Sequence, residues 1–315
     1  MIEVDGISKR FGPIVAVDDI SFSISRGEIL GFLGPNGAGK TTTMRILTGY
    51  IFPDTGTARV AGYDIFESPI EVRKHIGYLP ENNPLYTDMS VWDYLEFIAQ
   101  VRDIPKSERR RRIDEVIQIC GLESVIYRDI EELSKGYRQR VGLAQCMIHD
   151  PDILILDEPT SGLDPNQIVG IRELIKELGK EKTVIISTHI LPEVSATCNR
   201  VIIINRGKIV ADGSPDELSD MARGKLSIFV SLKAQKEDVE AKLSELPWIE
   251  SFTEAPSTEE GALRYKITPS DNDGRTEELF KLAVQSGWVI TELYREKATL
   301  EDVFRQLTTQ DEVAA

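Results

Sequence analysis

A glycine-rich segment of the sequence has the residue types and spacing of a phosphate-binding loop. Residues 34–41 read Gly-Pro-Asn-Gly-Ala-Gly-Lys-Thr and fit the pattern G-x-x-x-x-G-K-[ST]. The loop stands between an apolar run at 28–33 that predicts a strand and a helical run at 42–47. Glycines let backbone N–H groups turn inward around a phosphate, and the helix N-terminus adds positive partial charge. The residues expected to hold phosphate are Gly34, Pro35, Asn36, Gly37, Ala38, Gly39, Lys40, Thr41 and Thr42.

Two side chains of this loop have separate expected roles. Lys40 supplies a full positive charge to the terminal phosphates, and Thr41 offers a hydroxyl to Mg²⁺, which takes few protein ligands. The alternative is a structural glycine-rich turn. A chance match to the pattern is expected in roughly one chain per hundred of this size, so the phosphate site is favoured.

An acidic pair follows a second buried strand. Residues 153–156 form a continuous apolar run, which is typical of a parallel sheet covered on both faces, and Asp157 and Glu158 come next. Acids at the carboxyl end of such a strand lie where α/β sheets bind ligands. We expect Asp157 to hold Mg²⁺ and Glu158 to act as general base on the attacking water. An isolated pair of this kind is often only an acidic turn, but beside a phosphate loop an active site is the better interpretation.

The strands and helices that carry these residues divide the chain in two. Up to about residue 215, short apolar strands alternate with helical stretches and glycine turns, as in an α/β domain. The later part predicts the order β-α-β-β-α-β of a ferredoxin-like α+β domain, assigned to residues 225–310. Its expected strands are 226–233, 248–253, 262–267 and 288–294, its helices are 236–246 and 275–286, and a closing helix covers 299–307.

Composition limits the class of protein. The formal net charge is -15, and residues 216–315 alone carry 21 acidic and 12 basic residues, which argues against broad contact with nucleic acid. The three cysteines, Cys120, Cys146 and Cys198, match no metal or disulfide pattern and suit a reducing setting. No signal pattern opens the sequence, and the longest apolar runs are too short to span a membrane. The composition therefore predicts a cytoplasmic protein without a membrane span.

One further segment resembles the motif of a known family. Residues 133–140 read Leu-Ser-Lys-Gly-Tyr-Arg-Gln-Arg, with Ser134 placed 23 residues before Asp157, and they look like the signature motif of ABC (ATP-binding cassette) ATPases. The resemblance implies a P-loop NTPase cassette over residues 1–220, with a helical subdomain at about 84–150. It also implies that Ser134 and Gly136 contact the ATP held by the opposite subunit. Lys135 and Tyr137 depart from the commonest form of the motif.

Other positions match the same family residue by residue. His189, after the apolar run 184–187, stands where the family has a switch histidine that contacts the γ-phosphate, and Phe11 matches the aromatic that stacks on adenine. Asp164 ends a segment, 161–164, that resembles the loop crossing the dimer interface. Glu81 replaces the usual Gln; it is expected to ligate Mg²⁺ or hold a water in the catalytic site.

The resemblance implies a function. The chain is expected to bind and hydrolyse ATP with Mg²⁺ as cofactor and to energise export through separate membrane-spanning permease subunits. Two copies would close as a homodimer around the nucleotides. The protein would lie on the inner face of the cell membrane, and residues 299–304 resemble the tail of drug-export and gliding-motility ATPases. The sequence identifies no cargo.

The alternative is a soluble ABC ATPase that acts in DNA repair or on ribosomes. Repair members insert long coiled coils between loop and signature, whereas Lys40 and Ser134 are 94 residues apart without sustained heptads. Ribosome-acting members usually carry two cassettes, and this chain has one set of motifs. Transport is therefore the favoured function.

Overall fold

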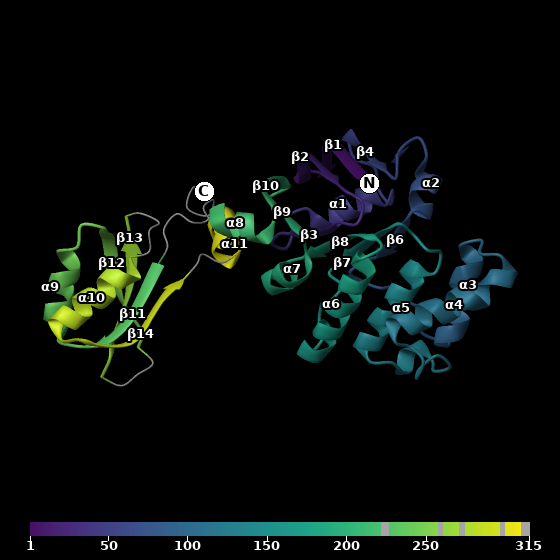
Figure 1. The fold of residues 1–315 in the computed structure, drawn as a ribbon. Coiled ribbons are helices and arrows are strands. Elements are labelled where there is room, and N and C mark those ends of the chain that lie inside the picture. The colour runs from purple at the N-terminus through teal and green to yellow at the C-terminus, as the bar shows by residue number, and fades with distance from the viewer. Residues whose placement is uncertain (222–226, 258–260, 271–274, 297–299, 310–315) are drawn as a thin grey trace. The chain divides into compact units, whose positions relative to one another are not determined.

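The computed structural model divides into two compact units, Met1–Pro215 and Asp216–Ala315 (Figure 1). The structure describes residues 1–221, 227–257, 261–270, 275–296 and 300–309. Within these ranges, no helix has the length and apolar character needed to cross a membrane.

A six-stranded sheet forms the base of the first unit. Five of its strands, β3 and β6 to β9, run parallel, and β10 pairs antiparallel at one edge. Because parallel strands end at the same edge, the segments after β3, β7 and β8 meet there. In spatial order the strands are β10 (Lys208–Gly213), β9 (Arg200–Asn205), β3 (Ile29–Leu33), β8 (Thr183–Thr188), β7 (Ile153–Asp157) and β6 (Ile76–Leu79).

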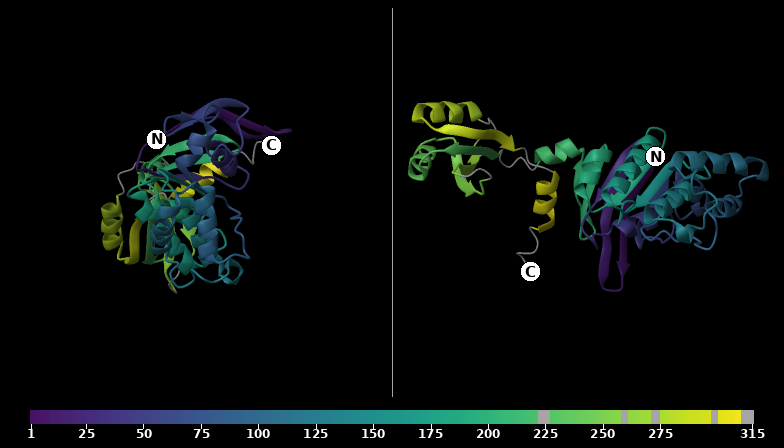
Figure 2. Two further views of the ribbon diagram at one scale, coloured as in Figure 1. Left: turned by 90° about the vertical axis from the view of Figure 1, so that its right-hand side faces the viewer. Right: turned by 90° about the horizontal axis from the view of Figure 1, so that it is seen from below.

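A second, antiparallel sheet packs over the first. Apolar residues of both sheets and of helix α1 (Lys40–Leu47) share one buried core, which includes Ile7, Leu30 and Met44. The hairpin of β1 and β2 projects from this unit in the right-hand view of Figure 2. The strand order is β2 (Ile14–Ile24), β1 (Ile2–Phe11), β4 (Thr55–Val60) and β5 (Tyr63–Asp64).

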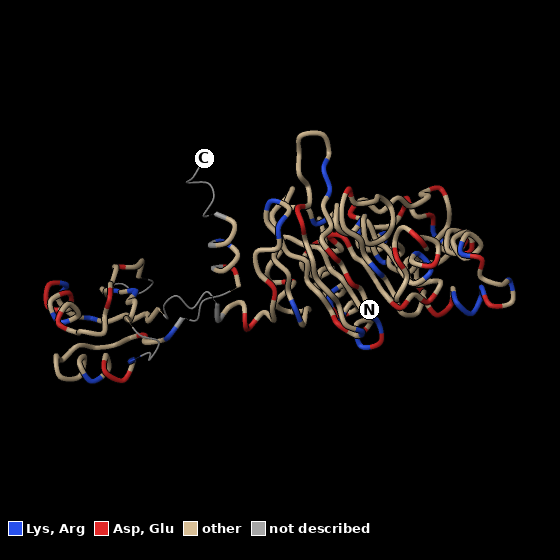
Figure 3. The backbone as a smooth tube through the Cα atoms, turned by 90° about the horizontal axis from the view of Figure 1, so that it is seen from above, with Lys and Arg blue, Asp and Glu red and all other residues tan. Residues whose placement is uncertain are grey.

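Three helices gather at one end of the first unit (Figure 1). Helices α3 (Val91–Val101), α4 (Lys106–Cys120) and α5 (Lys135–Met147) contact one another and bury an apolar stripe each. Figure 3 marks the acidic and basic residues along the backbone. Helix α4 contains both kinds, and its Arg110 Nε lies 3.8 Å from Asp114 Oδ2. The remaining α-helices of this unit are α2 (Pro69–Lys74), α6 (Pro165–Gly179) and α7 (Leu191–Thr197), and a short 3-10 helix covers Ile130–Glu132; α8 (Pro215–Met221) begins at the last residue of the unit.

The second unit has the element order that the apolar alternation predicts, although individual bounds differ by a few residues. Its four strands are all antiparallel, in the order β12-β13-β11-β14. The predicted element ends at 226 and 299 lie outside the described residues. Along the chain come β11 (Ser227–Lys233), α9 (Lys236–Ser244), β12 (Ile249–Ala255), β13 (Leu263–Pro269), α10 (Thr276–Ser286), β14 (Val289–Glu296) and α11 (Leu300–Thr309).

The core of this second unit lies between its sheet and helices α9 and α10. Alternate residues of the inner strand β11, Ile228, Val230 and Leu232, are buried together with Tyr265 and Leu279. The intervening residues of that strand therefore belong to the other face of the sheet, as the period of two requires.

A buried histidine of the first unit makes its stability sensitive to acid. Burial lowers the pKa of His149 from its ordinary value near 6.5 to about 4, and His149 Nε2 lies 3.1 Å from the carbonyl oxygen of Ile76. Between pH 6.5 and 4, His149 is therefore protonated in the unfolded chain but neutral in the folded chain. Its contribution to the free energy of unfolding is fully present above pH 6.5 and decreases as the pH falls through this window, by roughly 1 to 3 kcal/mol.

We predict that His149→Gln flattens this part of the pH profile. Calorimetric unfolding of the first unit should show a smaller loss of Tm between pH 6.5 and 4.5 in the variant than in the wild type. Between pH 7 and 8.5 the two profiles should run parallel, because His149 is neutral in both states there. Equal acid sensitivity of the two proteins would contradict this assignment.

Candidate active site

The phosphate loop connects β3 to α1 at the carboxyl edge of the sheet. Lys40 is buried, and its Nζ donates hydrogen bonds to the carbonyl oxygens of Gly34 (2.8 Å) and Pro35 (3.2 Å). A Cβ at Gly34 would lie 2.5 Å from the Ile204 carbonyl oxygen, and Gly39 has a φ of 111°. These two positions therefore require glycine, Gly34 because of the close Ile204 backbone and Gly39 because of its positive φ.

Asp157 ends β7 beside this loop and is completely buried. The hydroxyl of Ser187 donates to Asp157 Oδ1, whereas Oδ2 is buried and has no hydrogen-bond partner among the described residues. A buried carboxylate oxygen without a partner is rare in folded proteins, because it loses its hydration without compensation. The oxygen is thus available to a cation or to a water bound to one.

Glu158 stands at the centre of the charged groups. Its Oε1 lies 3.6 Å from Lys40 Nζ, and its two carboxylate oxygens lie 2.9 and 3.0 Å from His189 Nδ1. Burial lowers the pKa of Lys40, and the nearby Glu158 carboxylate opposes part of that shift. Glu158 has a φ of 50°, a backbone conformation that a non-glycine residue adopts at a cost of about 1 to 3 kcal/mol.

A cavity of about 510 Å³ opens over these groups. It brings together residues that the sequence analysis placed in one site, from the loop, from the Asp157–Glu158 turn, from the end of β8 and from the segment after β6. Phe11 does not line it; this half-exposed residue pairs through its backbone with Ile14 at the tip of the β1–β2 hairpin. The lining residues are Ile14, Ala16, Asn36, Gly37, Gly39, Lys40, Thr41, Thr42, Glu81, Glu158, Ser161 and His189.

Three of these lining residues were not among the predicted site residues: Ile14, Ala16 and Ser161. Ala16 belongs to the site because its carbonyl oxygen packs against Gly39, where a Cβ would come within 2.3 Å. That contact joins residues 23 positions apart, and no local pattern in the sequence predicts it. Ser161 lies close after the acidic turn and could have been included on that ground.

Eight predicted residues do not line this cavity: Gly34, Pro35, Ala38 and Asp157, each close in sequence to a lining residue, and Phe11, Ser134, Gly136 and Asp164. Ser134 caps α5, with its Oγ accepting from Tyr137 N at 3.4 Å, and Asp164 caps α6, with Oδ1 accepting from Gln167 N at 3.0 Å. A Cβ at Gly136 would lie 2.7 Å from the side chain of Gln167, so the beginnings of α5 and α6 are in contact. Within one chain, the signature motif is therefore separate from the Lys40 cavity.

The segment of residues 83–92, which follows β6, borders two further cavities. Pro84, Leu85 and Tyr86 line one of about 440 Å³. Pro84 also lines one of about 870 Å³, between α1, β6 and α3. Trp92 lines neither of them, and its ring lies under Arg110 at 5.7 Å.

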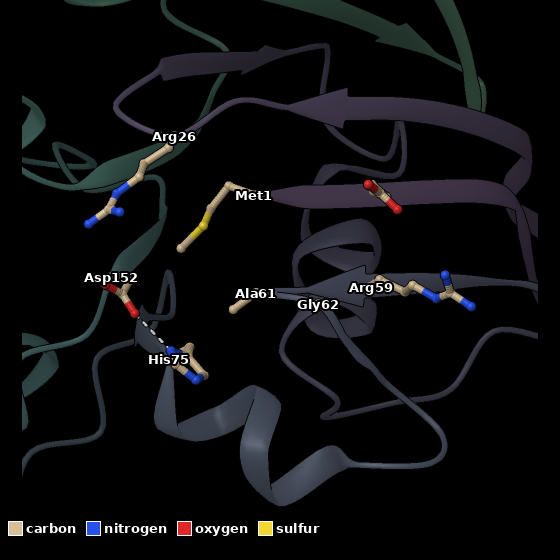
Figure 4. A pocket seen from close by; sticks show the side chains of 8 residues that line it. Met1, Arg26, Arg59, Ala61, Gly62, His75 and Asp152 are labelled. Atoms are coloured by element: carbon tan, nitrogen blue, oxygen red, sulfur yellow. Dashed lines mark hydrogen bonds and ion pairs between the residues drawn. The ribbon is translucent and has the colours of Figure 1, made fainter.

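Another cavity, of about 350 Å³, lies at the opposite edge of the sheet (Figure 4). Its floor holds a pair of side chains, His75 and Asp152, with Nδ1 and Oδ2 2.7 Å apart. These residues directly precede β6 and β7, so the cavity is at the amino ends of the strands. Ligands of open α/β sheets bind at the carboxyl ends, so the Lys40 cavity is the better candidate.

The fold and its phosphate loop define a phosphate-loop ATPase cassette, and comparison with known proteins agrees with this class. The ABC transporter family model matches residues 17–161. The Bacillus subtilis protein YxlF, described as an uncharacterized ABC transporter ATP-binding protein, is 32% identical over 305 residues, which cover 96% of this chain and 98% of YxlF. The Nod factor export ATP-binding protein I of Ralstonia nicotianae is 36% identical over 219 residues, 69% of this chain and 68% of that protein.

A solved structure shows the same fold. The ATP-binding cassette MJ0796, determined as a dimer in a post-hydrolysis state with ADP and Pi, superposes with a TM-score of 0.62 at 24% identity, covering 68% of this chain and 98% of MJ0796. The chain belongs to the ATP-binding proteins of ABC transporters, a family of ATPases.

Proposed function

We propose that this chain is the ATP-hydrolysing subunit of an ABC exporter, in which two copies close on ATP and drive separate permease subunits. One observation carries the proposal: Lys40, Glu158 and His189 meet in one cavity, whereas Ser134 and Gly136 lie outside it in the same chain. A second copy in head-to-tail contact can supply the missing groups. Ser134 has a hydroxyl at the N-terminus of α5, and this combination suits an anion.

In this proposal each group at the cavity has one role. The loop around Lys40 binds the phosphates, Glu158 accepts a proton from the attacking water, and His189, which contacts Glu158, orients that water and the γ-phosphate. Thr41, Asp157 and Glu81 would hold Mg²⁺, which supplies charge neutralisation on the phosphates. Phosphoryl transfer depends mainly on positioning and on charge stabilisation, so an incomplete site hydrolyses slowly.

The adenine end of the nucleotide is assigned to the hairpin tip. Ile14 lines the cavity, and the half-exposed Phe11 is its backbone partner across the β1–β2 turn. An aromatic ring against a base contributes about 1 to 3 kcal/mol, which supports a stacking role for Phe11. Asp164, at the start of α6, is assigned to the interface between the copies.

The permease is assigned to the groove beside residues 83–92. The 870 Å³ cavity there is the most spacious of those described for this unit, and its lining mixes apolar with basic side chains, among them Arg45, Arg73 and Arg102. A short permease segment can fit such a groove. The printed name of the Ralstonia relative, an export ATP-binding protein, supports export as the direction. The proposed location is the cytoplasmic face of the cell membrane.

The domain assignment follows the same reasoning. Residues 1–220 are assigned to the cassette, with 84–150 as its helical subdomain, and residues 225–310 to a ferredoxin-like extension. The strand order β12-β13-β11-β14 and the element order β-α-β-β-α-β support this interpretation of the second unit.

Ser134→Arg tests the shared site. The arginine projects from the capping position of α5, where the proposal places the contact with the second copy. The variant should therefore bind ATP as a monomer, and its rate of ATP hydrolysis should fall by at least about 10²-fold. Hydrolysis rates, together with ATP affinity from equilibrium binding, measure both properties. Ser107→Arg, at an exposed position of α4, is the matched control and should behave as wild type. Undiminished hydrolysis by Ser134→Arg would contradict a site completed by a second copy.

A further inference from the structure

A buried acid behind the site has partners that the proposed mechanism does not use. Glu193, in the first turn of α7, is only 5% exposed and does not line the Lys40 cavity. Its Oε1 accepts a hydrogen bond from Thr160 Oγ1 at 2.5 Å, and its Oε2 accepts one from Thr188 Oγ1 at 3.1 Å. Both threonines are buried as well. A carboxylate in this position uses both oxygens to connect two loops.

The two loops are those that carry the reacting groups. Thr160 follows Glu158 by two residues, and Thr188 directly precedes His189. The hydroxyl of Thr188 also accepts from Ile190 N at 3.1 Å, which fixes the turn on the far side of His189. Glu193 therefore joins the two chain segments whose side chains, Glu158 and His189, are in contact at the cavity.

The conformation of Glu158 needs this kind of support. Its φ of 50° is sparsely populated by non-glycine residues, and such a conformation persists only where neighbouring contacts hold it. Backbone hydrogen bonds hold it on both sides: Glu158 N donates to the Ser187 carbonyl oxygen at 2.9 Å, and Ser161 N donates to the Glu158 carbonyl oxygen at 3.1 Å. Thr160, between Glu158 and the end of that turn, has its side chain fixed by Glu193.

We propose that Glu193 is a positioning residue for ATP hydrolysis, holding Thr160 and Thr188 so that Glu158 and His189 keep their relative geometry. A hydrogen bond to an ionised acceptor is roughly twice as strong as a neutral one, so the carboxylate suits this role better than an amide. The proposal rests on the proposed role of Glu158 as base. It predicts that the loss of Glu193 slows catalysis while ATP binding by the phosphate loop is kept.

Glu193→Gln and Thr160→Val test the contact from both ends. Gln keeps the size of Glu but presents an amide NH₂ where a hydroxyl donates, and Val replaces the hydroxyl by a methyl group. Each should lower kcat by about 10- to 100-fold, since displacement of a catalytic group by about 1 Å costs on that order. KM for Mg²⁺-ATP should stay within about threefold, because neither residue lines the cavity.

A double variant and a conservative variant separate positioning from a merely structural role. The kcat of the combined Glu193→Gln/Thr160→Val protein should lie within about twofold of the kcat of the slower single variant. Both changes break the same contact between Thr160 and Glu193, so their effects should not multiply. Thr160→Ser keeps the hydroxyl and should retain near wild-type kcat. All rates are measured on the full chain, at a temperature well below each variant's unfolding midpoint.

Several results would overturn the inference: both single variants within about twofold of wild-type kcat, or multiplicative losses in the double variant, or Thr160→Ser as slow as Thr160→Val. If Glu193→Gln does not fold, the comparison of Thr160→Val with Thr160→Ser decides alone. Failure here is distinct from failure of the proposed function. An inactive Glu158→Gln beside a fully active Glu193→Gln contradicts only the positioning role, whereas an active Glu158→Gln contradicts the base itself.

Discussion

Glu158→Gln is expected to lower kcat for ATP hydrolysis by about 10²- to 10⁴-fold, the usual effect of removing a positioned general base. The amide has the size of the carboxylate and can still contact His189, but it cannot accept the proton of the attacking water. ATP affinity should change little, because the proposed phosphate contacts come from the loop around Lys40 and not from Glu158. Release of phosphate under single-turnover conditions measures the chemical step without interference from product release.

Glu173→Gln is the matched control for this prediction, since Glu173 is an exposed acid of α6. It should hydrolyse ATP at the wild-type rate. A Glu158→Gln variant whose single-turnover rate lies within about threefold of wild type would show that Glu158 is not the base.

Lys40→Met should weaken ATP binding by about 10- to 100-fold, because a hydrogen bond to a charged group contributes about 1.5 to 3 kcal/mol. Hydrolysis should fall further, since the ammonium also stabilises charge on the transferred phosphoryl group. The fold should persist. Burial lowers the pKa of Lys40, which means that the charged ammonium is held there at a cost and that an apolar side chain of similar length is tolerated.

Equilibrium titration with ATP, with and without Mg²⁺, measures the loss in Lys40→Met, and circular dichroism with thermal unfolding checks the fold. Lys106→Met, at the exposed start of α4, is the matched control and should bind ATP normally. Unchanged affinity in Lys40→Met would show that this loop does not hold the phosphates.

The parts of the site that lie at strand ends could be predicted from the sequence. A strand, a glycine-rich loop and a helix are contiguous around Lys40, and an apolar run ends directly at Asp157. Parallel strands bring the loops at their carboxyl ends to one edge of the sheet, so local patterns were sufficient to predict that Lys40 and Glu158 lie close together. His189 was assigned to the site through the family resemblance. The glycine of the loop with φ 111° likewise belongs to a recognisable pattern.

Features that depend on contacts distant in sequence could not be predicted in this way. The contact of Ala16 with Gly39 requires the β1–β2 hairpin to fold over the phosphate loop. Glu193 looks like an ordinary acid in the first turn of a helix, and only the structure shows that its partner Thr160 lies 33 residues earlier. The positive φ of Glu158 gives no signal in the residue types, because glutamate rarely adopts it.

The second unit shows the same division. Alternating apolar residues predicted its strands and helices, since Ile228, Val230 and Leu232 must share one buried face. The order of the strands in space, with β11 between β13 and β14, depends on pairings across the whole unit. A periodic pattern assigns each strand a buried face but does not assign its neighbours.

The proposed closure of two copies around ATP is tested by the oligomeric state of Glu158→Gln. Sedimentation velocity of the purified variant should show a monomer without nucleotide and a dimer with Mg²⁺-ATP, because binding favours closure and the missing base prevents the hydrolysis that reopens it. ADP should not produce the dimer, and Ser134→Arg introduced into the same variant should abolish it. A variant that binds ATP and stays monomeric at every ATP and protein concentration would show that the two copies do not share the site.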